Sequence, residues 1–533
     1  MARENWTSSL GFVLASAGAA IGLGNVWKFP YVAGANGGAT FVLVYILCVL
    51  FVGLPVMSSE MLIGRFTRRN VINAMGKVER VANSVRGRLV LSMLSAAVAV
   101  LFATMHSWLF AAVAVFGVWA FARRGFAVIG WLCTAVALSI LSYYAVVGGW
   151  IVEYIWRAVS GTLLNGVGVA MSESAEIAAV AEASGDAFGA YAGNPMRVLV
   201  GFLVFMSLTG TVILGGIQSG IERVSKVLMP ALFILMLVVI VRSVSLPGAW
   251  DGVRFLLKPD FDKLNSGVWL VAMGQAFYSL SLGMAITVTY GSYLHKNQNI
   301  FKAAGWVGVL DTMAAMLAGL AIFPAVFAAG LQPTAGPGLI FGALPAIFAE
   351  MPLGSLWAAC FFIMLLVAAV TSSVSLLECG ATVFIERIRR GHRRFDRRHA
   401  VLLSFTLVTL LGLLTVFSTL DWKAMPGVGH TLKNLLGDLY RGSWFDTLDN
   451  FASNWCLPFV ALATTFLIGW CWRPDRAAPR LLAHGEQVKP FMAFLMKAWG
   501  FSVRWLAPVA IFLVFLDSVG VRKALLEWIR NFY

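Results

Sequence analysis

The chain has 533 residues, of which 59% are hydrophobic and only 12% are charged, and its formal net charge is +15. A soluble protein of this length could not bury so many apolar side chains. Apolar runs of about 20 residues recur along the chain, and each is long enough to cross a hydrocarbon core roughly 30 Å thick. The composition therefore excludes a soluble globular protein and predicts a helical membrane protein with many spans.

Basic residues are concentrated in short segments between the apolar runs, which disfavours nucleic-acid binding as the reason for the positive charge. Lysine and arginine are enriched in the cytoplasmic loops of membrane proteins, and this pattern predicts which loops are cytoplasmic. The segment at 160–195 is acidic instead, in keeping with an outer loop, and carries Glu173, Glu176, Glu182 and Asp186. The basic clusters are Arg65, Arg68, Arg69, Lys77 and Arg80; Arg387, Arg389, Arg390, Arg393, Arg394, Arg397 and Arg398; and Arg473, Arg476 and Arg480.

The cysteines and the N-terminal apolar run indicate neither a disulfide framework nor a cleaved signal. All six cysteines lie in apolar runs without metal-ligand spacing, and we interpret them as small buried residues: Cys48, Cys133, Cys360, Cys379, Cys456 and Cys471. The first apolar run has no small-residue cleavage site and many spans follow it, so it is expected to stay in the protein.

The apolar runs predict eleven spans, at 8–32, 38–63, 127–158, 196–215, 225–243, 267–294, 302–328, 355–386, 399–419, 445–472 and 494–519. If the N-terminus is cytoplasmic, the loops that follow even-numbered spans are cytoplasmic as well. The arginine-rich loops lie on that side only if the apolar segment 89–122 crosses the membrane an even number of times. Arginines flank this segment on both sides. It is therefore expected to form a shallow re-entrant or interfacial hairpin that turns near His106 and Ser107.

Two spans contain unusually weak helix formers near their middle. The stretch ASAGAAIGLGNVWKFPY, residues 15–31, and the stretch GQAFYSLSLGMAITVTYGSY, residues 274–293, lie five spans apart. Interrupted helices in corresponding positions of two five-span halves are typical of inverted-repeat transporters. Unwound backbone frees carbonyls for cations and directs half-helix N-termini at an anion. Close packing of small residues is the alternative, and the matched positions favour a binding site.

Several motifs then carry a resemblance to a known family: GLGNVWKFPY with NGGATF, GIERVSKVLMP, GQAFYSLSLG and TSSVSLLE. The chain resembles the neurotransmitter:sodium symporters, in particular their bacterial amino-acid transporters, over nearly its whole length except residues 80–122. The resemblance implies an all-α polytopic membrane protein with a LeuT-type 5+5 inverted repeat, broken first and sixth helices and an eleventh span. Residues 1–243 would form the first repeat with an inserted apolar segment at about 80–122, residues 267–472 the inverted second repeat, and residues 473–533 the eleventh span and C-terminal tail.

The same resemblance implies two sodium ions bound largely by neutral backbone and side-chain oxygens, which suit a hard monovalent cation. The first site would take the Ala20 carbonyl, the Asn25 side-chain oxygen, Ser279, Asp311 and the substrate carboxylate. The second site would take the carbonyls of Gly18, Ile21 and Ala368 and the hydroxyls of Thr371 and Ser372. Without the resemblance, the hydroxyls of the triplet at 371–373 would be expected to bond back to the preceding helical turn.

Asp311 departs from the asparagine that is commoner at this position in the family. Some bacterial members carry a glutamate one turn later, where this chain has Ala315, and chloride-dependent members bind an anion nearby. We therefore hypothesise that Asp311 both binds sodium and supplies the negative charge, which makes transport chloride-independent. A protonated structural aspartate is the alternative. Tyr45, Gln275 and Ser279 correspond to the surroundings of the chloride site, so that cavity is expected to be retained.

The substrate pocket implied by the resemblance suits an α-amino acid. Tyr144 would donate its hydroxyl, and Gly24 its backbone N–H, to the substrate carboxylate. Monoamine transporters carry an aspartate at the position of Gly22, so a glycine there implies a substrate that brings its own carboxylate. The remaining wall is apolar, and burying a leucine- or phenylalanine-sized side chain is worth roughly 1.5–3 kcal/mol. The full set is Ala19, Ala20, Gly22, Gly24, Ile140, Tyr144, Tyr278, Ser281, Met284, Ser372 and Leu376.

The gates are also implied by the resemblance. Lys28 and Asp449 would form the outer pair and Tyr278 the aromatic lid. Lysine replaces the usual arginine and lacks its bidentate fork. The inner network would comprise Arg3, Trp6, Tyr293 and Glu386. The alternative for each exposed pair is a snorkelling side chain or a surface salt bridge worth under about 1 kcal/mol.

The implied function is sodium-coupled symport of a hydrophobic or aromatic α-amino acid by alternating access. The expected location is a bacterial inner (plasma) membrane with a cytoplasmic N-terminus, and the expected partners are the amino acid, two Na⁺ ions and lipid, without nucleic acid. An amino-acid sensor of the same fold stays open as an alternative. A membrane enzyme is disfavoured because the histidines are scattered without H-x-x-x-H spacing, and a channel because gates are expected on both sides of the pocket.

Overall fold

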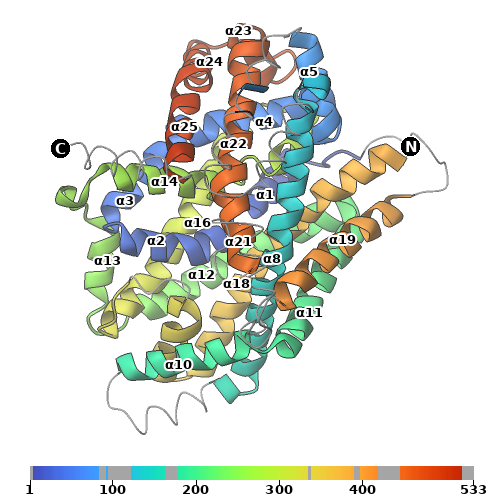
Figure 1. Cartoon of the computed structure of the whole chain (residues 1–533). Coiled ribbons are helices and arrows are strands. Elements are labelled where there is room, and N and C mark those ends of the chain that lie inside the picture. Colours follow the sequence, from blue (N-terminus) through green and yellow to red (C-terminus); the bar gives the residue numbers. More distant parts are fainter. Residues whose placement is uncertain are drawn as a thin grey trace, which may run out of the picture.

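The computed structural model describes residues 4–82, 92–93, 96, 120, 122–163, 177–333, 338–388, 396–417 and 444–518 (Figure 1). Every regular element within these ranges is a helix. Nine of the described helices are long and apolar enough to cross a membrane, and the bent pair Ser9–Ala20 and Gly24–Ala35 makes a tenth. The prediction of an all-α, polytopic membrane protein is therefore confirmed.

The elements follow one another in the order below, where η marks short π or 3₁₀ turns. They are α1 (Ser9–Ala20), η1 (Gly24–Lys28), α2 (Phe29–Ala35), α3 (Ala39–Cys48), η2 (Val49–Gly53), α4 (Leu54–Thr67), α5 (Val71–Ala82), α8 (Ala127–Val159), α10 (Ile177–Ala192), α11 (Pro195–Leu214), η3 (Ile217–Glu222), α12 (Arg223–Val244), α13 (Ala249–Leu257), η4 (Phe261–Lys263), α14 (Ser266–Ser279), α15 (Ile286–Gly291), α16 (Ile300–Ala328), η5 (Leu339–Ala343), α17 (Leu344–Ala349), α18 (Gly354–Ile388), α19 (Arg397–Phe417), α21 (Trp444–Asp449), η8 (Asn450–Cys456), α22 (Leu457–Phe466), η9 (Leu467–Trp472), α23 (Pro474–Ala477), η10 (Ala478–Leu481), α24 (Pro490–Phe501), η11 (Ser502–Leu506) and α25 (Ala507–Ser518).

Helix α8 forms the centre of the bundle and packs along α18 and α11. It meets α11 through two glycines. A Cβ on Gly149 would lie 2.5 Å from the Phe202 nitrogen, and one on Gly201 would lie 2.4 Å from the Gly149 carbonyl oxygen. Small residues of this kind let helix backbones approach closely within membranes. At the ends of the bundle, α5, α23 and α24 lie on one side of the molecule and α10 lies across the other (Figure 1).

The first span is broken where the sequence predicts it. Ser8 caps α1 by accepting a hydrogen bond from the Gly11 nitrogen at 2.9 Å. The helix ends at Ala20, and Ile21 takes a non-helical ψ of 89°. The chain then continues as η1 and α2 at an angle of 50° to α1.

The second break separates α14 from α15 and covers residues 280–285. Three of these residues have positive φ: Ser281 at 53°, Gly283 at 77° and Ala285 at 64°. Serine and alanine adopt this left-handed region only at an energetic cost, so neighbouring contacts must hold the segment in place. The predicted interruption of the sixth span is confirmed.

Some expectations stay predictions. Most of residues 89–122, including His106 and Ser107, lie outside the described residues, as does Arg3. The hairpin expected in that segment therefore remains a prediction. The division of the chain into two repeats and a C-terminal part, at residues 243, 267 and 472, also remains a prediction.

Candidate substrate and sodium sites

The two helix breaks enclose a small cavity of about 30 Å³. All eleven residues that the sequence assigns to the substrate pocket line it, together with Leu23 and Ile286. These two additional residues lie in or beside the breaks. Leu23 lies between Gly22 and Gly24, and Ile286 follows Ala285, so their sequence positions could have predicted them as lining residues. Space of this size accommodates about one water molecule, so the pocket is closed in this conformation.

One wall of the cavity is formed by Gly22, Tyr144 and Ser372. The Tyr144 hydroxyl accepts a hydrogen bond from the Leu23 nitrogen at 3.2 Å, which leaves its own proton available to an acceptor. A Cβ on Gly22 would lie 2.5 Å from the Ser372 Oγ and 3.0 Å from the Tyr144 hydroxyl oxygen. Any side chain at position 22 would therefore occupy the part of the pocket next to the Ser372 and Tyr144 hydroxyls.

Asp311 lies beside this cavity and is completely buried on α16. Its Oδ1 accepts hydrogen bonds from the Asn25 Nδ2 at 2.8 Å and from the Ser279 Oγ at 2.9 Å. Its Oδ2 lies 3.0 Å from the Tyr45 hydroxyl and 2.8 Å from the same Ser279 oxygen. All of these donors are neutral, and none of the described ion pairs includes Asp311. A buried carboxylate in such surroundings needs a cation or a proton to offset its charge.

Two of the residues predicted for the first sodium site, Asn25 and Ser279, thus contact Asp311. The amide nitrogen of Asn25 faces Asp311, whereas its Oδ1 lies 3.4 Å from the Gly22 nitrogen. A half-turn of this amide would present the oxygen to a bound cation. Ala20 lines the adjoining cavity.

Gln275 lies one helical turn before Ser279 on α14 and contacts the first span. Its Nε2 donates to the Gly24 carbonyl oxygen at 2.8 Å. Its Oε1 is buried and has no hydrogen-bond partner among the described residues. Gln275 therefore supports the unwound part of the first span, beside the Asp311 cluster.

The second predicted sodium site lies between α1 and α18. The Thr371 Oγ1 donates to the Ala368 carbonyl at 3.0 Å, and the Ser372 Oγ lies 3.2 Å from the Gly18 carbonyl oxygen. A Cβ on Gly18 would approach the Thr371 Cβ to 3.1 Å. The hydroxyl of Thr371 thus bonds back within its own helix, while that of Ser372 crosses to the first span. Ile21 follows in the break itself.

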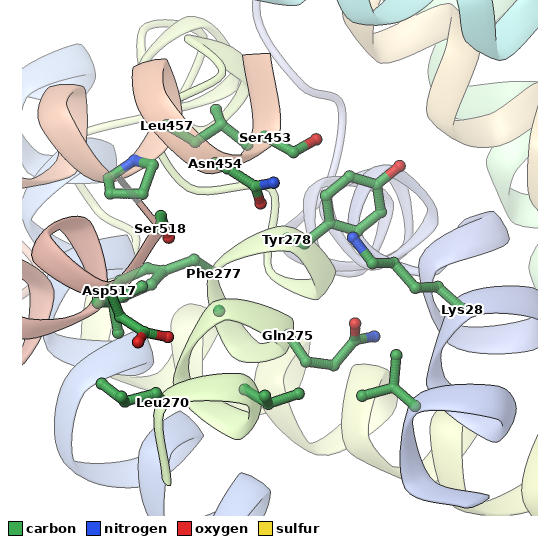
Figure 2. A pocket seen from close by; sticks show the side chains of 15 residues that line it. Lys28, Leu270, Gln275, Phe277, Tyr278, Ser453, Asn454, Leu457, Asp517 and Ser518 are labelled. Carbon is green, nitrogen blue, oxygen red and sulfur yellow. The ribbon is translucent and has the colours of Figure 1, made fainter. Parts of the chain in front are cut away.

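A larger cavity of about 310 Å³ lies on the side of Tyr278 that faces away from the substrate pocket (Figure 2). Tyr278 lines both cavities, so its ring is the partition between them. The Lys28 Nζ lies 4.3 Å from the centre of this ring, a cation–π geometry. Figure 2 shows Lys28 beside Tyr278, with Asp517 and Ser518 across the cavity.

The predicted ion pair between Lys28 and Asp449 does not form in this conformation. No described ion pair joins the two residues, and the Asp449 Oδ1 accepts a hydrogen bond from Ser453 at 2.9 Å. The physical reason is that the lysine side chain lies against the aromatic lid, where cation–π attraction replaces the Coulomb attraction to the carboxylate.

At the end of the molecule where residues 4–8 lie, Trp6 is buried and its indole N–H donates to the Tyr290 carbonyl at 3.1 Å. The linker between α15 and α16 closes over it, since a ring nitrogen of His295 lies 3.2 Å from the Trp6 carbonyl oxygen. Beyond this linker, Glu486 accepts a hydrogen bond from the Asn299 side chain at 2.7 Å, which lowers the pKa of Glu486. The Trp6 backbone nitrogen also donates to the Tyr293 carbonyl oxygen at 3.4 Å. The inner network itself remains a prediction.

Tyr293 joins a cluster that sequence reasoning missed. Its hydroxyl donates to the Glu378 carboxylate at 2.8 Å, and the Arg397 guanidinium contacts the same carboxylate at 2.6 Å. Glu378 ends the TSSVSLLE motif and is a fully buried carboxylate in an apolar helix, which was the available signal. Glu386 accepts hydrogen bonds from the Asn70 backbone at 2.7 Å and the Asn73 side chain at 2.9 Å, and its predicted place in the inner network stays a prediction.

Comparison with known proteins identifies sodium-dependent transporters as relatives of this chain. The model of the family described as "Sodium:neurotransmitter symporter family" matches residues 3–116 and 192–425. The chain is 35% identical over 516 residues to YhdH of Bacillus subtilis, called an uncharacterized sodium-dependent transporter, with 97% of this chain and 98% of YhdH covered. It is 30% identical to an uncharacterized sodium-dependent transporter of Haemophilus influenzae, again with 97% and 98% covered.

A solved structure has the same fold. The crystal structure of MhsT in complex with L-phenylalanine matches with a TM-score of 0.74 and 34% sequence identity, covering 97% of this chain and 100% of MhsT. This match confirms the LeuT-type repeat with broken first and sixth helices. The relatives found are transporters rather than enzymes. The chain therefore belongs to the sodium:neurotransmitter symporter family.

Proposed function

We propose that this symporter moves a hydrophobic or aromatic α-amino acid into a bacterial cell together with sodium. The observation that carries the proposal is the convergence of all eleven predicted pocket residues on one closed cavity beside the Asp311 cluster. A pocket between two helix breaks places backbone polar groups near the middle of the membrane, where an amino acid's two charges can be satisfied.

The pocket's chemistry supports an α-amino acid. The substrate carboxylate would lie near Gly22 and the Tyr144 hydroxyl, where the absence of a side chain leaves room. Ile140, Met284 and Leu376 supply an apolar wall for the substrate side chain. The related MhsT was crystallised in complex with L-phenylalanine, which supports the same substrate class for this chain.

Two sodium ions would couple to this substrate. The first would lie among Ala20, Asn25, Ser279 and Asp311 and would share the substrate carboxylate as a ligand. The second would lie among the carbonyls and hydroxyls that join α1 to α18. A shared ligand makes the binding of ion and substrate mutually dependent, which is the basis of coupled transport.

Asp311 would also make transport independent of chloride. The protein already supplies one buried negative charge beside the first sodium site, held by Asn25, Ser279 and Tyr45. An added anion would then be an uncompensated charge in the membrane interior, which is costly.

Alternating access would use the gates at the two ends of the pocket. Tyr278, with Lys28 packed against its ring, would close the outer side of the pocket. Asp449 would pair with Lys28 in other conformations. Trp6, Tyr293, Glu386 and Arg3 would close the cytoplasmic side. The N-terminus would then lie in the cytoplasm of the bacterial cell, as the basic loops indicate.

Binding of labelled amino acids to the purified protein, in sodium and in potassium, tests the proposal. We expect sodium-dependent binding of phenylalanine-, leucine- or tryptophan-like ligands. Binding that is equal in both salts would contradict ion coupling. Reconstituted vesicles then separate transport from sensing, because only a transporter accumulates the labelled amino acid against its gradient.

A further inference from the structure

A cavity of about 580 Å³ lies apart from the substrate pocket and from both predicted sodium sites. It is lined by the starts of α1 and α16, by the linker between α15 and α16, and by the linker between η10 and α24. The two linkers are joined by a hydrogen bond from the His484 nitrogen to the Lys296 carbonyl oxygen at 3.0 Å. The cavity lies at the end of the molecule where residues 4–8 lie, because α1 begins at Ser9.

Lys302 and Glu486 place an ammonium group beside a carboxylate at this cavity. The Lys302 Nζ lies 3.5 Å from the Glu486 Oε1, which is longer than a good hydrogen bond. The other carboxylate oxygen, Oε2, accepts from the Asn299 side chain at 2.7 Å and from the Ala483 nitrogen at 3.2 Å. Within the described residues, the Glu486 Oε1 therefore keeps its capacity to accept hydrogen bonds, and the Lys302 ammonium keeps its capacity to donate them.

Gln298, which also lines the cavity, adds a second acceptor. Its side-chain Oε1 is buried, and no described residue donates a hydrogen bond to it. Its backbone carbonyl accepts a hydrogen bond from the Arg65 guanidinium, which holds this part of the linker against α4. A buried acceptor without a donor is costly, and a ligand that brings an N–H group removes that cost. The cavity therefore offers acceptors for an ammonium group and, beside them, a cation for an anionic group.

An exposed apolar stripe leads from the cavity along α16. Three apolar side chains follow Lys302 at helical spacing and share its face of the helix: Trp306, Val309 and Met313. They are 61%, 56% and 41% exposed, respectively, on a helix that is long and apolar enough to span the membrane. Tryptophan is enriched where the hydrocarbon core meets the lipid headgroups. The cavity thus lies at the level of the headgroups, and the stripe leads from it toward the acyl chains.

We propose that this cavity binds the headgroup of phosphatidylethanolamine. The ammonium group of the lipid donates hydrogen bonds to the Glu486 and Gln298 side-chain oxygens, and its phosphate accepts them from Lys302. The acyl chains lie along the apolar stripe of α16. Phosphatidylcholine fits less well because its trimethylated ammonium has no N–H group to donate. Phosphatidylglycerol fits less well because it brings a negative charge and no cation to Glu486.

A lipid in this cavity joins two spans. Ser9 and Val13 of α1 line the same cavity as Lys302 of α16, so a bound headgroup holds the first half of the broken first span against α16. The inference goes beyond the proposed function, because neither the substrate nor sodium occupies this cavity. Lipid binding and amino-acid transport can therefore fail independently of each other.

Native mass spectrometry of the full-length protein in detergent tests the headgroup. The protein is titrated with palmitoyl-oleoyl lipids that differ only in the headgroup: phosphatidylethanolamine, its N-methyl and N,N-dimethyl derivatives, phosphatidylcholine and phosphatidylglycerol. We expect the first phosphatidylethanolamine to bind roughly tenfold more tightly than phosphatidylcholine or phosphatidylglycerol, with affinity falling as methyl groups replace N–H donors. Equal affinities across the series would overturn the proposal without any variant, and so would tightest binding of phosphatidylglycerol.

Two substitutions separate the contacts. Glu486→Gln removes the charge that faces the ammonium group, so the preference for phosphatidylethanolamine over phosphatidylcholine should fall below about threefold. Lys302→Ala removes the phosphate contact, so both lipids should bind more weakly while the preference between them remains. Asp475→Asn on α23 and Lys497→Ala on α24 are the matched controls, because both side chains are exposed and lie outside the cavity. An unchanged preference in Glu486→Gln would count against the proposed contact.

A soluble competitor distinguishes a lipid from a free zwitterion. Glycerophosphoethanolamine carries the same headgroup without acyl chains, so it should displace the bound lipid only at a concentration at least about a hundredfold higher. Trp306→Ala shortens the apolar stripe and should weaken every lipid by about threefold or more. Displacement at equal concentrations would show that the cavity takes a soluble zwitterion, and would overturn the lipid as its occupant.

Discussion

Single side chains around the pocket determine which charges this symporter must import and which it already contains. Asp311 supplies a negative charge within the protein, whereas Gly22 supplies only space. In the proposed function the two positions have opposite needs: the buried carboxylate of Asp311 would bind a cation from solution, and the space at Gly22 would receive a carboxylate from the substrate. Each need can be tested by one substitution.

Removing the charge of Asp311 should create a need for chloride. We expect wild-type uptake in reconstituted vesicles to be equal in chloride and gluconate. Asp311→Asn should lose at least about tenfold of its uptake in gluconate and recover part of it in chloride, because an external anion can then replace the missing charge. Strong chloride dependence of the wild type would contradict the role given to Asp311.

Adding a side chain at Gly22 should block the substrate carboxylate. The methyl group of Gly22→Ala would approach Ser372 and Tyr144 to 2.5 and 3.0 Å. We expect sodium-dependent binding to weaken by roughly five- to hundredfold, since overpacking costs about 1–3 kcal/mol. Gly305→Ala on α16 is the matched control, because nothing lies within 4 Å of its added Cβ. Equal binding by both variants would place the carboxylate elsewhere.

At the scale of the helices, contacts between elements decide which conformations are closed. The outer lid joins η1 to α14 through Lys28 and Tyr278. The Glu378 carboxylate of α18 contacts Arg397 of α19 and Tyr293, which lies just after α15. Both contacts tie a broken helix to its neighbour.

Loss of the lysine should loosen the outer lid. Lys28→Gln removes a cation–π contact worth about 0.5–2 kcal/mol, which corresponds to roughly two- to thirtyfold faster substrate dissociation. Washout of labelled substrate from detergent-purified protein measures this rate. Tyr278→Leu should show the same acceleration, and the double variant should add little to either. Fully additive effects would mean that the two side chains act separately.

Removing Arg397 should destabilise the junction of α15, α18 and α19. Arg397→Ala leaves the fully buried Glu378 without its cation, at a cost of about 3 kcal/mol in the free energy of unfolding. Thermal unfolding of the purified protein measures the loss. The double variant Glu378→Gln/Arg397→Ala should lose less than Arg397→Ala alone, because no charge is then left unpaired. A larger loss in the double variant would contradict this reason.

The helix breaks could be predicted from the sequence because their signals are local, whereas the pocket residues were implied by the resemblance to a known family. Glycines and serines in mid-span marked both interruptions, and motif order placed Tyr144 and Ser372 beside Gly22. The gate contacts could not be predicted in the same way. The reach of Lys28 allows either a carboxylate or an aromatic ring as its partner, and only the packed structure selects Tyr278. Likewise, nothing local singles out Arg397 among its neighbouring arginines as the partner of Glu378.

For the molecule as a whole, ligands that bind in the closed pocket should raise the stability of the folded protein. Bound ligand stabilises the folded state by mass action, by about 2.7 kcal/mol at a hundred times its dissociation constant. We expect L-phenylalanine to raise the unfolding temperature in sodium but not in potassium. Sodium alone should raise it less than sodium and phenylalanine together. An equal rise in both salts would show that substrate binding does not require the ion.

The size of the inner cavity has a consequence for leakage through the protein. At about 30 Å³, the empty pocket has room for about one water molecule. A carrier that reorients in this collapsed state takes almost no solvent and no solute of substrate size across the membrane. Leakage of solutes of substrate size through the protein should therefore stay small even when its substrate is scarce.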